Sequence, residues 1–205
     1  MPAGIPMSRR LWRNRQRDHK FHAIEHFDAW SIAVEMQGVN LLEISERLHH
    51  LKLSRPVVST SATVHGGREQ RAAANVYILS LHQLRTAAGF VAQTWAEPAR
   101  QVVEDAIRGM DNSIQALRQI RNAVTHFEDY AKGSGSLQRG MLLPTLEYVF
   151  ATTSRDPARF DVEIEVFIGG VDDEDSELFL SVADSLDAAM LAARKIAQAT
   201  FVFPG

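Results

Sequence analysis

The chain has 205 residues, of which 45% are apolar, and 22 Lys and Arg against 25 Asp and Glu give it a formal net charge of -3 at pH 7. This apolar content can form a folded core and excludes a disordered chain. Cysteine is absent, which excludes disulfides, thiolate metal sites and a cysteine nucleophile and is compatible with a reducing compartment.

No apolar run reaches the roughly 18 residues that a membrane-spanning helix needs, and no apolar segment follows the charged start of the chain. We therefore expect a cytoplasmic protein with no membrane association. The charges are uneven, because residues 1–150 hold 18 Lys and Arg against 14 Asp and Glu, whereas residues 151–205 hold 4 against 11. A basic part suits a polyanionic partner such as RNA, although two solvated surfaces would explain the same distribution.

Residues 1–21 are predicted to form a basic N-terminal arm or a short helix, in which cationic residues are interleaved with Leu11 and Trp12. One interpretation is contact with the phosphate backbone of RNA, and the alternative is a solvated, frayed terminus. The candidate RNA-binding residues of the arm are Arg9, Arg10, Arg13, Arg15 and Arg17.

Residues 22–135 are predicted to form a helical bundle. Apolar residues recur at helical spacing over residues 22–53, with an irregularity allowed near Gly38. Residues 54–67 combine a Ser/Thr run with two glycines and are predicted to form a loop.

The helical spacing resumes over residues 69–95, and Pro98 suits the first turn of the next helix. Gly109 either ends that helix and allows a new one over residues 113–132, or bends a single helix. Gly133 ends the helical region in both cases.

Residues 141–205 are predicted to form a small antiparallel β-meander and a final helix, packed on the bundle or attached as an appendage. Apolar residues at alternate positions over 160–168 are separated by Asp161, Glu163, Glu165 and Phe167, a pattern typical of a half-buried strand, and weaker strand patterns cover residues 146–152 and 177–182. An apolar stripe predicts a helix over residues 184–201. The predicted fold class is mainly α, an up-and-down helical bundle with a small sheet, and α+β overall.

The predicted helix before Gly133 carries the residues best suited to chemistry. At 100° per residue, Arg118, Asn122, His126 and Tyr130 form one polar stripe beside the apolar face. A neutral imidazole can accept a hydroxyl proton near neutral pH, and a guanidinium can bind phosphate oxygens. These groups are typical of phosphodiester cleavage without a metal or other cofactor.

The pattern Arg121-Asn122-x-x-x-His126 resembles the R-x4-H signature of HEPN domains, including the polar residue that commonly follows the arginine. Many members of that family are helical, metal-independent endoribonucleases, often toxins or host-defence effectors, that act as homodimers. The resemblance covers roughly residues 22–135 and implies Arg121, Asn122 and His126 as catalytic residues, with Arg118 and Tyr130 as supporting residues. Some members carry a tyrosine two positions after the histidine, so the match of Tyr130, at four positions, is offset.

Arg121 and His126 are five positions apart, or about 140° around a straight helix, so one protomer need not direct both side chains at one phosphate. A two-fold pairing of this helix would bring both arginines and both histidines into one cleft, as the resemblance implies. In the alternative interpretation, Arg121 pairs with Glu128 or Asp129 and His126 is solvated. The protein would then be an inactive module that binds nucleic acid or a partner protein. A toxin would further imply an antitoxin or neighbouring protein as its partner.

Other histidines have weaker patterns. His22 and His26 are spaced to share a metal with Glu25 beside them, but no third ligand can be named, so surface histidines are the preferred interpretation. His82 lies on a predicted helix without a partner pattern, and we expect it to lie on the surface or to accept a hydrogen bond in the core. No metal site is predicted.

Overall fold

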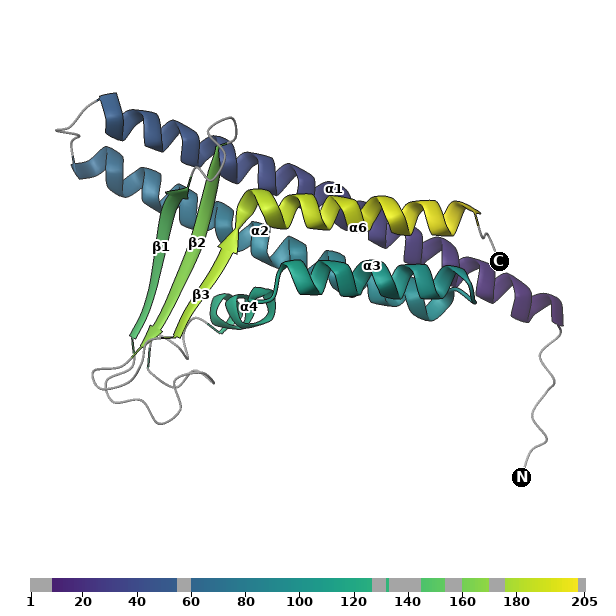
Figure 1. Ribbon diagram of the computed structural model, residues 1–205. Coiled ribbons are helices and arrows are strands. Elements are labelled where there is room, and N and C mark those ends of the chain that lie inside the picture. Colours follow the sequence, from purple (N-terminus) through teal and green to yellow (C-terminus); the bar gives the residue numbers. More distant parts are fainter. Residues whose placement is uncertain are drawn as a thin grey trace.

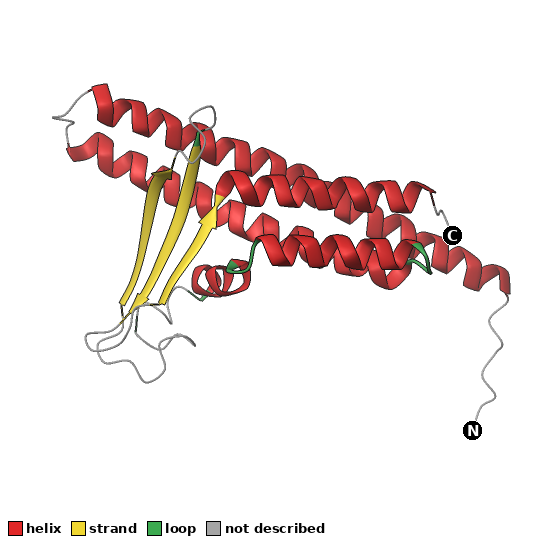
Figure 2. Cartoon of the chain, in the orientation of Figure 1, coloured by secondary structure: helices red, strands yellow, loops and turns green. Residues whose placement is uncertain are grey.

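The computed structural model describes residues 9–54, 60–126, 132, 145–153, 160–169 and 176–202. Its elements, in chain order, are α1 (Arg9–Ser54), α2 (Thr60–Thr94), α3 (Ala99–Ser113), α4 (Leu117–Thr125), β1 (Thr145–Thr153), β2 (Asp161–Gly169), β3 (Ser176–Ser181) and α6 (Val182–Val202). Helices dominate, accompanied by one small antiparallel sheet (Figure 2), so the predicted mainly α fold class is confirmed. In the described ranges, no helix is long and apolar enough to cross a membrane.

The long helices α1 and α2 run side by side as an antiparallel pair, and the sheet, α3 and α6 pack against that pair (Figure 1). One continuous apolar core includes side chains from the first helices, such as Phe27 and Leu81, together with Ile164 of β2 and Ile196 of α6. The C-terminal part therefore packs on the helical bundle through the same core.

The strands form an antiparallel meander in the order β1-β2-β3. On β2, the side chains of Val162, Ile164 and Val166 are buried, whereas those of Glu163 and Glu165 between them are partly exposed. This is the alternation expected of a sheet with one face on a core. The predicted strands agree with the observed ones to within one residue.

A hydrogen-bonded junction joins the sheet to α6. The carboxylate of Asp161 accepts hydrogen bonds from the backbone N–H of Ala183 at 2.9 Å and from the hydroxyl of Ser181 at 2.7 Å. The Ser181 hydroxyl oxygen in turn accepts a bond from the N–H of Asp184 at 3.0 Å, which caps the first turn of α6. The cap explains why α6 begins two residues before the predicted start.

Helix α1 is longer at its N-terminus, and more regular in its middle, than the sequence predicted. It begins at Arg9, so residues 9–21 of the predicted basic arm have a helical backbone continuous with α1. It also continues without interruption through Gly38. A Cβ at Gly38 would lie 3.0 Å from the Tyr77 ring and 3.1 Å from Leu186, so this glycine permits close approach of α2 and α6.

The loop predicted over residues 54–67 is too long, because α2 already begins at Thr60. Gly66 lies within this helix, and a Cβ there would overlap the side chain of Leu48 on α1. Gly66 therefore allows α1 and α2 to pack closely. The loop prediction was wrong here because a Ser/Thr run followed by two glycines is typical of a turn.

The helical region after Pro98 breaks at a different place from either predicted alternative. Helix α3 continues past Gly109 to Ser113, and α4 begins only at Leu117. At the other end, α4 stops at Thr125, although a helix was predicted to residue 132. Val124 and Thr125 are β-branched, and the Thr125 hydroxyl donates to the carbonyl oxygen of Arg121 at 2.9 Å. Residues 127–131 of the predicted helix lie outside the described residues.

Candidate functional site

Helix α4 is positioned by a narrow apolar face. Leu117, Ile120 and Ala123 are buried at spacings of three residues, and the helix packs on α2 and β3. Arg118 and Arg121, also three positions apart, lie beside that face and therefore project to the same side of α4. Burial of the apolar residues thus directs two guanidinium groups toward the surface of α2.

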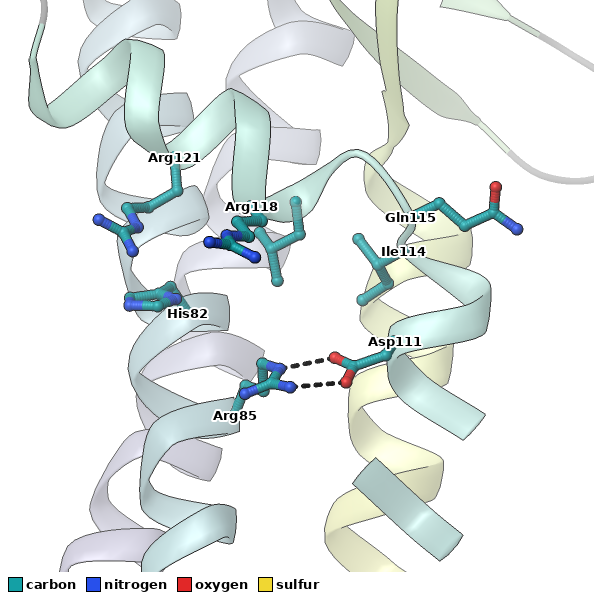
Figure 3. Close-up of a pocket in the computed structure, with 8 residues that line it drawn as sticks. His82, Arg85, Asp111, Ile114, Gln115, Arg118 and Arg121 are labelled. Atoms are coloured by element: carbon teal, nitrogen blue, oxygen red, sulfur yellow. Dashed lines mark hydrogen bonds and ion pairs between the residues drawn. The ribbon is translucent and has the colours of Figure 1, made fainter. Parts of the chain in front are cut away.

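The two arginines line a pocket of about 330 Å³ between α2, the end of α3 and the beginning of α4. The lining residues are His82, Arg85, Asp111, Ile114, Gln115, Leu117, Arg118 and Arg121. Figure 3 shows the guanidinium groups of Arg118 and Arg121 directed into the same space as the His82 ring. Segments more than 30 positions apart in the sequence therefore build one basic pocket.

One wall of the pocket is an ion pair that leaves no net charge. Arg85 donates two hydrogen bonds to the carboxylate of Asp111, at 2.7 and 2.8 Å, and the pair links α2 to α3 (Figure 3). This bidentate arrangement raises the pKa of Arg85. The positive charge available to a ligand therefore comes from the other wall.

Arg118 and Arg121 supply that charge. In the ranges that the structure describes, neither guanidinium has a carboxylate partner. Nε of Arg121 is buried and has no hydrogen-bond acceptor among the described atoms. A buried donor without an acceptor costs about 1–3 kcal/mol, and a bound oxyanion would remove that cost. Glu128 and Asp129, the carboxylates considered as alternative partners of Arg121, lie outside the described residues.

His82 contributes a titratable group to the same pocket. It is half-buried on α2, and its pKa lies below the ordinary value of a histidine because of desolvation, with further lowering by the positive charges of Arg121 and Arg85. At neutral pH the imidazole is therefore neutral and offers one N–H donor and one acceptor nitrogen.

The predicted partner histidine lies elsewhere. His126 follows the last residue of α4, with φ -111° and ψ 33°, and its side chain is exposed. It does not line the pocket that contains Arg121. Asn122 is partly exposed, and its backbone carbonyl oxygen accepts a hydrogen bond from the backbone N–H of His126 at 2.9 Å. The structure of one chain therefore brings Arg118 and Arg121 together but leaves His126 outside their pocket, and Tyr130 lies outside the described residues.

The basic residues at the N-terminus lie on the first turns of α1 (Arg9–Ser54). Their side chains, those of Arg9, Arg10, Arg13, Arg15 and Arg17, lie outside the described part of the structure. Their role in RNA binding stays a prediction.

The histidine pair considered for a metal has other contacts. His22 Nδ1 lies 3.6 Å from a carboxylate oxygen of Glu25, and the His26 ring packs edge-on against Trp30. Among the described residues, no group of three or more His, Asp or Glu side chains is arranged to hold a metal ion.

Sequence reasoning missed His82 as a member of the site. His82 is half-buried at the surface of α2, within the range expected for it, but its place beside Arg121 in the pocket was not predicted. The one usable signal was local, since His82 and Arg85 are three positions apart and share a face of α2. Nothing in that spacing identifies α4 as the opposite wall.

The comparisons with known proteins add no relative, because the chain matches no family model, no curated protein and no solved structure.

Proposed function

We propose that this protein is a metal-independent endoribonuclease, in which Arg121 holds a phosphate of RNA and His126 acts as general base or acid in a homodimeric site, with Asn122 orienting either group. The observation that carries the proposal is the pair of guanidinium groups, Arg118 and Arg121, that face an open pocket without described carboxylate partners. Planar, permanently charged donors suit phosphate oxygens and the charge that grows on them during cleavage.

A histidine supplies the proton transfer that this chemistry needs. Removal of the proton from a ribose 2′-hydroxyl allows its oxygen to attack the adjacent phosphorus, and the 5′-oxygen leaves with a proton. His126 is exposed to solvent at the end of the helix that carries Arg121. A second copy that packs along α4 would bring one protomer's imidazole toward the other's arginine.

The test is incubation of the purified protein with single-stranded RNA in excess chelator. We expect cleavage by the wild type, and a loss of about 100-fold or more with Arg121→Ala or His126→Ala. Arg100→Ala is the matched control, because Arg100 is an exposed arginine already paired with Glu104 at 2.8 Å. DNA of the same sequence should remain intact, because it lacks the 2′-hydroxyl nucleophile.

Mixing the two inactive variants tests the composite site. Arg121→Ala and His126→Ala protomers together retain one copy of each functional group, so a shared cleft should recover part of the activity. Full cleavage by both single variants would remove Arg121 and His126 from the mechanism. Absence of recovery in a mixture shown to contain heterodimers would contradict the shared cleft.

A binding module without catalysis is the second candidate. The position of His126 outside the pocket of Arg121 favours it, because the described protomer does not bring the two groups together. In that case RNA would be retained in a salt-sensitive manner and never cut. Expression in cells separates the two candidates, since a nuclease toxin should arrest growth as wild type but not as His126→Ala.

A further inference from the structure

We propose that the pocket formed by His82, Arg118 and Arg121 is a binding site for a phosphomonoester, the doubly charged phosphate found at the end of a nucleic acid or on a nucleotide. Three donor side chains from two helices converge there on one space (Figure 3). The Nε of Arg121 is a buried donor without an acceptor among the described atoms, and a phosphate oxygen in the pocket could accept its hydrogen bond.

The charge balance of the pocket favours a dianion. Asp111 neutralises Arg85 through two hydrogen bonds, so that pair contributes little net charge. Arg118 and Arg121 leave two positive charges, which match a phosphomonoester better than a singly charged phosphodiester. The two guanidinium groups project to the same side of α4, where they repel each other unless an anion lies between them.

The N-terminal end of α4 adds to the fit. The pocket is lined by Gln115, Leu117 and Arg118, at the N-terminal end of α4, where no side chain caps the helix. The partial positive charge of a helix N-terminus favours a nearby anion. Ile114 and Leu117 are buried and form the apolar part of the lining.

His82 makes the site responsive to protons. The imidazole faces Arg85 on its own helix and Arg118 and Arg121 on α4, with Asp111 of α3 already bound to Arg85. Desolvation, and after it the charges of Arg121 and Arg85, disfavour a positive charge on this imidazole and lower its pKa. A bound dianion reverses that balance, so His82 gains a proton from solvent and both of its ring nitrogens become donors as the ligand enters.

The inference deepens the proposed function and rests on it for the contact of Arg121 with phosphate. It adds that a terminal phosphate is distinguished from an internal one. RNA with a 5′-phosphate should therefore bind more tightly than RNA of the same sequence with a 5′-hydroxyl.

The test uses isothermal titration calorimetry of the full chain with inorganic phosphate, a nucleoside monophosphate, and the two forms of RNA just described. Arg118→Ala and Arg121→Lys should each weaken monoester binding by about tenfold or more, since lysine keeps the charge of Arg121 but loses the forked donors. Arg100→Ala is the control, and thermal melting of each variant verifies folding. Binding of inorganic phosphate and nucleotide without an RNA end effect would assign the site to a free phosphate compound.

Protonation of His82 can be distinguished from protonation of the ligand by using sulfate, which keeps its double charge between pH 8 and pH 6. As the pH falls from 8 to 6, the affinity for sulfate should rise in the wild type and stay level in His82→Gln. His50→Gln is the matched control, since His50 is exposed on α1. Equal pH dependence in wild type and His82→Gln would overturn the role of His82.

The outcomes also separate this inference from the nuclease. Cleavage of 5′-hydroxyl RNA together with no monoester binding would overturn the inference and leave the proposed function standing. Monoester binding that depends on Arg118 and His82, with no RNA cleavage in chelator, would support the pocket and contradict the nuclease. Monoester affinities unchanged in Arg118→Ala and Arg121→Lys would show that phosphate binds elsewhere on the protein.

Discussion

Two arginines project to the same side of the short helix α4, where their positive charges repel each other. Arg118 and Arg121 are held together because Leu117 and Ile120, next to them in the sequence, must be buried. In the described structure no carboxylate pairs with either guanidinium, and His82 lines the same pocket. Arg118 is exposed to solvent, so the cost lies mainly in the buried Nε of Arg121, which has no acceptor among the described atoms and which an oxyanion would satisfy.

His82 should make the free energy of unfolding depend on pH. In the unfolded chain this histidine gains a proton near pH 6.5, whereas the folded pocket lowers its pKa. The unfolded state therefore binds more protons as the pH falls through about 6.5, and stability decreases. In buffer without phosphate or sulfate, the melting temperature of His82→Gln should fall less between pH 7.5 and 5.5 than that of the wild type. An equal or larger fall in the variant would contradict the environment assigned to His82.

At the scale of elements, close helix packing explains the glycines that sequence patterns interpreted as breaks. Gly38 lies where Tyr77 of α2 and Leu186 of α6 approach α1, and Tyr77 is fixed because its hydroxyl bonds Ser185 at 2.9 Å. Gly109, by contrast, is exposed within α3, and a Cβ at this position would have no described atom beyond its own helix within 4 Å.

Matched substitutions should distinguish these two glycines. Gly38→Val should destabilise the fold by about 1–3 kcal/mol, because a branched side chain would overpack the junction of three helices. Gly109→Ala should stabilise it by about 0.5–1 kcal/mol through higher helix propensity. Urea denaturation measures both changes, and a neutral Gly38→Val variant would show that α6 does not approach α1 as described.

The elements themselves were largely predictable, because periodicity is a local property. Alternation of Val162, Ile164 and Val166 with acidic residues located β2, and the neighbouring strands followed from shorter patterns. Helix ends were less predictable, since α4 ends at Thr125 where the sequence has neither glycine nor proline. The pocket could be predicted only in part, because Arg121 stood out by its motif whereas His82 joins it through tertiary packing.

At the scale of the whole molecule, α2 and α4 build the basic pocket while the sheet and α6 complete the core beneath the same bundle. The uneven charge of the chain does not follow this division, because residues 1–20 hold 6 Lys and Arg against 1 Asp, residues 21–150 hold 12 against 13 Asp and Glu, and residues 151–205 hold the excess of acids. Long-range attraction of a polyanion would therefore come mainly from the N-terminal residues, and the acidic C-terminal part would repel it.

The most direct measurement is the salt dependence of binding between the protein and a fluorescent single-stranded RNA, followed by anisotropy. Loss of one phosphate contact should flatten the slope of log affinity against log salt by about 0.7. We expect Arg121→Ala to bind about tenfold or more weakly with this flatter slope, and Arg100→Ala to match the wild type. Unchanged affinity and slope in Arg121→Ala would contradict the central claim that this arginine holds a phosphate of RNA.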